Sequence, residues 1–268
     1  MSVERSYEHL EIERDGPVAT VTLDRPNELN ALNRGLMREL TAAAESFHDD
    51  TDTRVVVFTG RGRHFCAGMD LRDRAAAEDQ PRTRLDVRRS LKAGPALIRA
   101  IYEMNAVTIA AVNGGALGGG ACITTACDFR IGAVGSFVGY PEINLGMNLQ
   151  WVALPLCVHL IGPARAKRMI VLGRREPAET LLEWGFFDQV VPAESLLDSA
   201  HALAREYAAQ PPIAAQMIKQ SINAVVSALD GAIMHMDHDQ WLLTAASDDY
   251  REGIEAFFEK RKPKFTGN

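Results

Sequence analysis

The chain has 268 residues, of which 47% are hydrophobic and 24% are charged, and its formal net charge is −6. This length and composition are typical of one large globular domain or two small ones. A nucleic-acid-binding protein would need a basic face, which the acidic balance does not supply. No segment has the apolar length of a signal peptide or a membrane-spanning helix, so we expect a cytoplasmic protein without membrane contact.

The cysteines and histidines show no metal-site or redox spacing. Histidines 235 and 238, in HMDHD, have no third ligand cluster, so an exposed helix face is expected there and no metal. Free, buried thiols in a reducing compartment are expected for the four cysteines, which are Cys66, Cys122, Cys127 and Cys157.

Predicted strands and helices alternate through the first two thirds of the chain. Strands are indicated by β-branched or continuous apolar runs, and helices by apolar residues at helical spacing. In chain order the predictions are a strand at 17–23, a helix ending near Asp49, a strand at 53–60, a long helix at about 86–104, a strand at 107–114, a short helix at 121–127, a strand at 128–134, helices at 163–172 and 177–184, a short strand within 186–191, and helix almost throughout from about Glu194.

This order of elements predicts the domain organisation. Alternating strands and helices favour an α/β core, here residues 1–193, and the helical remainder favours an appendage, here residues 194–268. No solenoid repeat or low-complexity linker interrupts the chain.

A glycine cluster, NGGALGGGACITTACD at 113–128, stands between a predicted buried strand and a helix. Bare backbone N–H groups at a helix N-terminus favour a negatively charged ligand oxygen. The spacing is not the G-x-G-x-x-G of dinucleotide sites, and Ala121 and Cys122 stand where a triphosphate site needs Lys and Ser or Thr. Among these ligands a thioester or ester oxyanion, which needs only N–H groups, is favoured by elimination. A glycine-rich packing turn without a ligand is the alternative.

A second loop, HFCAGMDL at 64–71, is a candidate for the second N–H donor that an oxyanion hole needs. It also follows a buried strand, and its Asp70 can cap the following turn. Both loops would then lie at the carboxyl ends of strands, where open α/β sheets bind their ligands.

Five segments together resemble the crotonase, or enoyl-CoA hydratase/isomerase, family. They are RPNELNAL, FCAGMDL, AAVNGGALGGGACITTACDFRI, FVGYPEINLG and REGIEAFFEKRKPKF, in the family's order and over nearly the whole chain. The resemblance implies an α/β fold, a crotonase-like spiral of ββα turns with a helical C-terminal trimerisation region. It also implies acyl-CoA substrates, no cofactor beyond the coenzyme A of the substrate, and homotrimers that often pair as hexamers.

By motif position, the family's two oxyanion-hole N–H groups fall on Met69 and Gly119. The family's substrate and CoA contacts fall on loops near the first motifs and on the C-terminal segment, where they reach the CoA of a neighbouring subunit. The residues implied are Leu29, Ala67, Asp70, Leu71 and Arg72 in the loops, and Phe257 and Lys260 near the C-terminus.

One of the two glutamates of the family's hydratases is missing. Glu142, in GYPEINLG, matches the second glutamate, but Cys122 stands at the position of the first. The glycine-rich turn of hydratases is also replaced, by MNLQWVALP, and its Trp151 is expected to exclude water. A single glutamate suffices for the family's Δ3-Δ2-enoyl-CoA isomerases, so isomerisation is favoured over hydration. Cys122 is interpreted as a small buried side chain and not as a nucleophile.

Two alternatives stay open at this point. One is another one-acid reaction on an acyl-CoA, such as hydration assisted by Asp128 or Tyr140. The other is a CoA-binding member without catalysis. The segments 72–90 and 148–154 are expected to shape the acyl pocket, and the sequence does not indicate its chain length.

Overall fold

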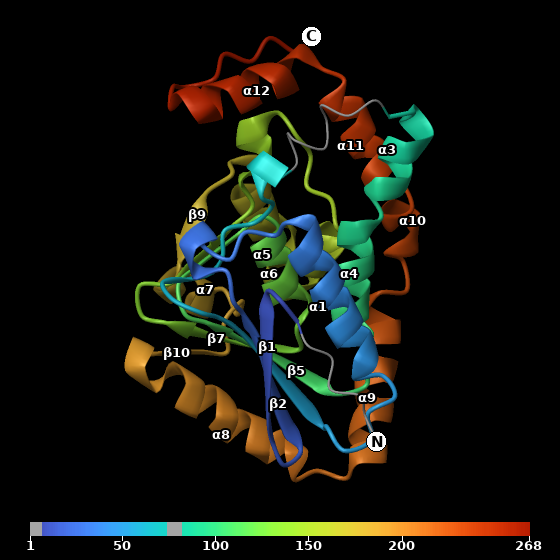
Figure 1. Cartoon of the computed structure of the whole chain (residues 1–268), viewed down its shortest axis with the longest axis vertical. Coiled ribbons are helices and arrows are strands. Elements are labelled where there is room, and N and C mark those ends of the chain that lie inside the picture. The colour runs from blue at the N-terminus through green and yellow to red at the C-terminus, as the bar shows by residue number, and fades with distance from the viewer. Residues whose placement is uncertain (1–6, 74–81) are drawn as a thin grey trace.

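The computed structural model describes residues 7–73 and 82–268, which form two sheets surrounded by helices (Figure 1). The larger sheet has the order β1-β2-β3-β5-β7-β10, and only the edge strand β1 runs antiparallel to its neighbour. Its strands are β1 (Leu10–Asp15), β2 (Val18–Leu23), β3 (Val55–Gly60), β5 (Val107–Val112), β7 (Phe129–Ala133) and β10 (Gln189–Val191).

The smaller sheet has the order β4-β6-β8-β9, with β9 antiparallel to β8. Three times the chain passes from a strand of the larger sheet to the next strand in the smaller one, from β3 to β4, β5 to β6 and β7 to β8. A helix follows each pair, which gives the predicted spiral of ββα turns. The strands of this sheet are β4 (His64–Cys66), β6 (Gly115–Leu117), β8 (Phe137–Gly139) and β9 (Arg175–Pro177).

Alternate residues of the larger sheet face two different cores. On β3, Val56 and Phe58 belong to the main core with the helices of the spiral, whereas Val55 and Val57 pack with α8.

The helices and turns of the spiral are η1 (Pro26–Glu28), α1 (Arg34–Ser46), α3 (Arg84–Ser90), α4 (Ala93–Tyr102), α5 (Gly119–Ala126), η2 (Pro141–Leu145), α6 (Ala153–Val171), α7 (Ala178–Glu183) and η3 (Ala193–Ser195).

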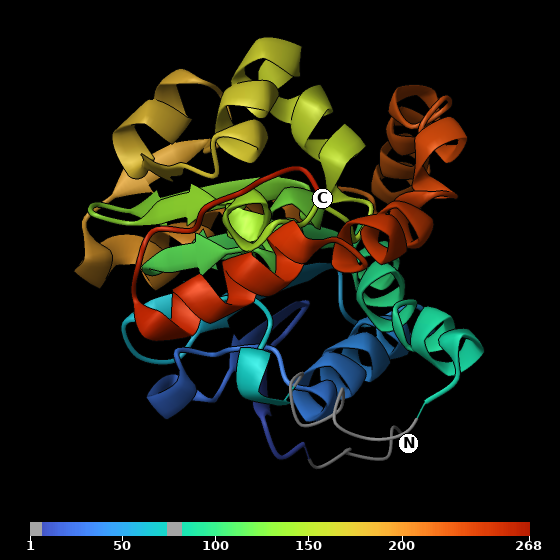
Figure 2. The ribbon, with the colours of Figure 1, turned by 90° about the horizontal axis from the view of Figure 1, so that it is seen from above.

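Five helices form the C-terminal region, as predicted. Helix α8 covers the larger sheet, and α12 lies against η2 (Figures 1 and 2). Helix α9 is joined to the spiral by buried Lys219, whose Nζ lies 2.7 Å from the Asp128 carboxylate and donates to the carbonyl of Ala106. The helices are α8 (Leu196–Ala208), α9 (Pro212–Val226), α10 (Gly231–Met234), α11 (Asp237–Ala245) and α12 (Asp248–Glu259).

The predicted helix at 86–104 is wrong, because the structure has two helices, α3 and α4, with a turn between them. Pro95 explains the break, since it has no N–H for the carbonyl of Leu91 and its ring would collide with that carbonyl. The part of the predicted pocket loop at 74–81 lies outside the described residues. In the described part of the chain, no helix combines the length and apolarity needed to cross a membrane.

The prediction of a helix at 163–172 identified only the second half of α6. The helix begins at Ala153, and Gly162, with φ 78° and ψ 162°, breaks its backbone before Pro163. The division into 1–193 and 194–268 stays a prediction, as does trimerisation.

Candidate active site

Three neighbouring parallel strands of the smaller sheet end beside one another. Strand β6 lies between β4 and β8, with Gly115 opposite His64 and Leu117 opposite Gly139. Met69, Gly119 and Glu142 each follow one of these strands by two or three residues. The smaller sheet therefore brings together the three residues expected to carry the chemistry, at the carboxyl ends of its strands.

The first two loops approach so closely that glycine is required at their contact. A Cβ at Gly68 would lie 2.7 Å from the carbonyl oxygen of Leu117, and one at Gly118 would lie 3.8 Å from the Cα of Gly68. Both residues have positive φ, 92° at Gly68 and 52° at Gly118. The glycines therefore allow the backbones just before Met69 and Gly119 to lie in contact.

The backbone N–H groups of Met69 and Gly119 are placed to bind an anion. Leu32 donates to the carbonyl of Gly68 and accepts from the N–H of Asp70, so the N–H of Met69 points away from Leu32. Gly119 is the first residue of α5, where N–H groups have no partner within the helix and the helix dipole is positive. That these two N–H groups together form an oxyanion hole stays a prediction.

Glu142 lies in the second position of η2, with its carboxylate against Gly118. Its Oε1 would lie 3.0 Å from a Cβ at Gly118. Its Oε2 is buried and has no hydrogen-bond partner among the described residues. Burial raises the pKa of Glu142 to about 7, and a hydrogen bond to a backbone N–H offsets part of the increase. A carboxylate of this kind can take up and return a proton near neutral pH.

Cys122 lies one turn into α5, fully buried, and its N–H donates to the carbonyl of Gly118. Burial raises the pKa of its thiol well above the usual value, and the negative charge of Glu142 raises it further. The thiol is therefore neutral at physiological pH, which disfavours a nucleophilic role.

The indole of Trp151 lies between α4 and the first turn of α5. A Cβ at Gly94 would come within 2.0 Å of the ring, and a Cβ at Gly119 within 2.5 Å of it and 2.8 Å of Leu32. The side of Gly119 that a Cβ would occupy is therefore apolar. The backbone N–H of Trp151 donates to Oδ2 of buried Asp237 on α11, a residue that the sequence interpretation missed. The prediction of an exposed helix face at HMDHD is wrong for Asp237, which is buried because it faces the backbone of Trp151 and Val152.

The predicted CoA-contacting loops are adjacent. Ala67 donates to the carbonyl of Leu29 at 3.0 Å, and Leu29 has a left-handed backbone with φ 54°. Asp70 accepts the N–H of Arg72 at 3.2 Å, which confirms its predicted capping of the turn. It also lies 3.3 Å from the Arg25 guanidinium.

The remaining predicted contacts lie at two places. Leu71 is half-buried and Arg72 exposed after the Met69 loop. Phe257 and Lys260 are exposed on and just after α12, and 56% of the Phe257 surface is accessible. Because α12 packs on η2, these two side chains belong to the helix that covers the Glu142 turn.

The two residues considered as assisting acids are already engaged in other contacts. Asp128 accepts from the N–H and hydroxyl of Thr108 at 2.7 and 2.9 Å and pairs with Lys219. The hydroxyl of Tyr140 is buried and hydrogen-bonded to Thr125, and burial raises its pKa. Both side chains therefore have polar partners of their own in this structure.

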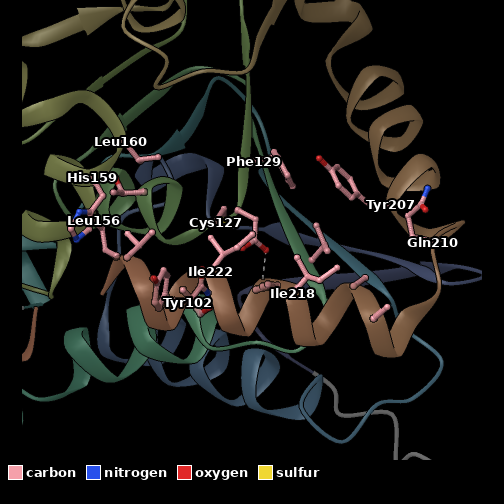
Figure 3. A pocket seen from close by; sticks show the side chains of 18 of the residues that line it. Tyr102, Cys127, Phe129, Leu156, His159, Leu160, Tyr207, Gln210, Ile218 and Ile222 are labelled. Carbon is pink, nitrogen blue, oxygen red and sulfur yellow. Dashed lines mark hydrogen bonds and ion pairs between the residues drawn. The ribbon is translucent and has the colours of Figure 1, made fainter. Parts of the chain in front are cut away.

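A cavity of about 480 Å³ lies along α9, and Met69, Gly119 and Glu142 are not among the residues that line it. Figure 3 shows Leu156 and His159 at one end, Phe129 and Tyr207 at the other, and Ile222 of α9 below them. The Asp128–Lys219 pair also lines it. Its position makes it a feature of the contact between α9 and the spiral, separate from the candidate active site.

Comparison with known proteins agrees with this arrangement. The sequence profile of the enoyl-CoA hydratase/isomerase family matches residues 13–268. The chain is 36% identical to the 1,2-epoxyphenylacetyl-CoA isomerase of Escherichia coli, over 93% of this chain and 95% of that protein. It is 35% identical to a probable enoyl-CoA hydratase of Mycobacterium bovis, over 97% and 99%.

A solved structure shows the same fold. The enoyl-CoA hydratase of Mycobacterium avium subsp. paratuberculosis superposes with a TM-score of 0.86 at 26% identity, over 97% of this chain and 100% of that one. The spiral, the adjacent strand ends and the family match agree, and the chain belongs to the enoyl-CoA hydratase/isomerase family of the crotonase superfamily.

Proposed function

We propose that this acyl-CoA enzyme isomerises 3-enoyl-CoA thioesters to 2-enoyl-CoA thioesters, with Glu142 as the only proton carrier. The proposal is supported mainly by the carboxylate of Glu142, whose buried Oε2 has no hydrogen-bond partner among the described residues and which lies against Gly118, at the contact between the two glycine-bearing loops. Cys122, a neutral thiol, stands where a second acid would be needed for hydration.

The proposed reaction is a proton transfer from C2 to C4 of the acyl chain. Glu142 removes a proton from C2, and the electrons move into the thioester to give a dienolate. The N–H groups of Met69 and Gly119 stabilise the negative oxygen. Glu142 then returns the proton at C4, and the double bond comes into conjugation with the thioester carbonyl. No metal or further cofactor takes part in this scheme.

Hydration is the second candidate, because the relative from Mycobacterium bovis is named a probable hydratase and Asp237 is a second buried carboxylate. The packing of Trp151 and Leu32 against Gly119 favours isomerisation. Hydration needs a bound water as the nucleophile, and the carbon atoms that these side chains place beside Gly119 offer it no hydrogen-bond partner. The relative from Escherichia coli is named an isomerase of 1,2-epoxyphenylacetyl-CoA, which supports isomerisation of an acyl-CoA in general but not the double-bond shift itself.

The product of a medium-chain 3-enoyl-CoA distinguishes the two candidates. Isomerisation gives a conjugated thioester with new ultraviolet absorbance and unchanged mass. Hydration gives a product heavier by one water. Formation of the hydrated thioester as the first product would overturn the proposal.

The pH dependence should follow the pKa of Glu142. The carboxylate is the active form, so kcat/KM is expected to fall about tenfold per pH unit below pH 7 and to level off above it. A profile that is flat from pH 5 to 8 would contradict a base whose pKa burial has raised. The measurement is initial rates with a 3-enoyl-CoA over this pH range, with circular dichroism to confirm folding.

Cys122→Ala is expected to keep most of the activity. The thiol is neutral, and its replacement removes only one buried sulfur, at a cost of about 1 kcal/mol in the free energy of unfolding. Steady-state kinetics and urea unfolding measure the two effects. An inactive but folded Cys122→Ala enzyme would show that the thiol takes part in the chemistry.

We also propose a homotrimer formed through the helical C-terminal region. Helix α9 and the residues after it expose a row of large apolar side chains, of which Val225 is 78% and Leu229 83% accessible. Burying such a row is the usual reason for association. Phe257 and Lys260 would then be available to the CoA of a neighbouring subunit. Sedimentation equilibrium tests the stoichiometry, including the dimer of trimers.

A further inference from the structure

We infer that Asp237 is a positioning residue, which holds the backbone of Trp151 and Val152 so that the indole covers the first turn of α5. No residue of α11 was predicted for the site. The inference rests on the proposed function only in that enoyl-CoA turnover serves as one readout.

Two successive N–H groups converge on one oxygen of Asp237. The N–H of Trp151 lies 2.6 Å and that of Val152 3.2 Å from Oδ2. Both residues have left-handed backbones, with φ 66° and 53°. This conformation is unfavourable for a bulky aromatic and for a β-branched residue, so it persists only where its surroundings impose it. The buried carboxylate oxygen supplies that constraint.

The conformation determines where the indole lies. The ring occupies the space beside Gly94 and Gly119, and even a methyl group at either glycine would overlap it. If the backbone at Trp151 relaxed to an ordinary conformation, the ring would leave this position. Gly119, which carries one of the proposed oxyanion N–H groups, would lose its apolar cover.

One face of α11 contacts both ends of the segment from Met147 to Val152. Trp241 donates to the sulfur of Met147, and Gln240 and Thr244 contact Asn148 at 3.3 and 3.4 Å. With Asp237 these residues stand at positions i, i+3, i+4 and i+7, which share one helix face. Asp237 is therefore part of an extended contact that fixes the loop between η2 and α6.

Proton transfer is the competing role for Asp237. It is buried, and burial raises its pKa although the two N–H groups lower it. It also lies close enough for its charge to raise the pKa of Cys122. Because Oδ2 accepts both N–H groups, only Oδ1 is available to carry a proton, and variants are needed to separate the two roles.

Asp237→Asn and Asp237→Ala separate these two roles. The amide of Asn keeps an oxygen that accepts both N–H groups but cannot transfer a proton at neutral pH. We expect Asp237→Asn to keep most of the wild-type kcat, and Asp237→Ala to lose about 10- to 100-fold of it through misplacement. Asp239→Ala is the matched control, since Asp239 lies on the exposed side of α11 and pairs with Arg88.

Val152→Gly tests the backbone directly. Glycine adopts positive φ without strain, so it needs less help from the carboxylate. We expect Asp237→Ala to lower kcat by a smaller factor when residue 152 is glycine than when it is valine. Equal factors in both backgrounds would overturn the role in holding this backbone.

Amide hydrogen exchange gives a readout without turnover. The amides of Trp151 and Val152 should exchange faster in Asp237→Ala than in wild type and stay protected in Asp237→Asn. Unchanged protection in Asp237→Ala overturns the inference. So does an Asp237→Asn enzyme that is as inactive as Asp237→Ala, since that result assigns a proton-transfer role. A hydrated product would overturn the proposed isomerisation while leaving the exchange result to decide on Asp237.

Discussion

Glu142→Gln is expected to reduce kcat by about 10³-fold or more, in line with the loss of a general base. The amide has nearly the shape of the carboxylate but cannot accept a proton from carbon. Affinity for acyl-CoA should stay close to wild type, because in the proposed mechanism the N–H groups of the other two loops bind the thioester oxygen. Stopped-flow or steady-state assays with a 3-enoyl-CoA measure the rate, and calorimetry with a saturated acyl-CoA measures binding.

Glu179→Gln is a matched control for this variant. Glu179 is an exposed carboxylate in the first turn of α7, so its replacement should leave the rate unchanged. A Glu142→Gln enzyme with nearly the wild-type rate would remove Glu142 from the mechanism. Loss of acyl-CoA binding together with rate would instead indicate that the side chain shapes the pocket.

Much of the larger sheet could be predicted from the sequence, because its strands are long and buried. The run at 53–60 is continuous and apolar, and β3 begins at Val55 and ends at Gly60. The edge strand β1 was not predicted, since Glu11 and Glu13 leave it only a weak apolar alternation. A solvent-facing edge strand has little need for buried residues.

The smaller sheet could not be predicted, although it positions the site. Strands β4, β6 and β8 have three residues each, and glycine occupies one position in β6 and one in β8, so no periodicity indicates them. The family resemblance identified Glu142 through its motif, but only the parallel pairing shows why it meets the glycine cluster. Asp237 was missed because it lies 85 residues or more from its partners in the sequence, and no local sequence pattern indicates this contact.

Gly118→Ala is expected to damage both stability and catalysis. Gly118 has φ 52° and ψ −119°, a conformation that an alanine adopts only with strain of about 1–3 kcal/mol. Its new Cβ would also lie 3.0 Å from Oε1 of Glu142, closer than carbon and oxygen ordinarily approach. The carboxylate or the loop before Gly119 must therefore move. We expect kcat to fall about 100-fold, because misplacing a general base or an oxyanion donor lowers the rate by roughly this factor.

Gly16→Ala separates backbone strain from contact with the base. Gly16 has a similar φ, 56°, but a Cβ there would meet no atom within 4 Å. Urea unfolding should show destabilisation in both variants, whereas enoyl-CoA turnover should fall only in Gly118→Ala. If Gly118→Ala kept the wild-type kcat, Glu142 and the glycine loop would not act on the same reacting atoms. Because Gly118 contacts both Glu142 and the Met69 loop, its substitution tests whether base and oxyanion hole form one site.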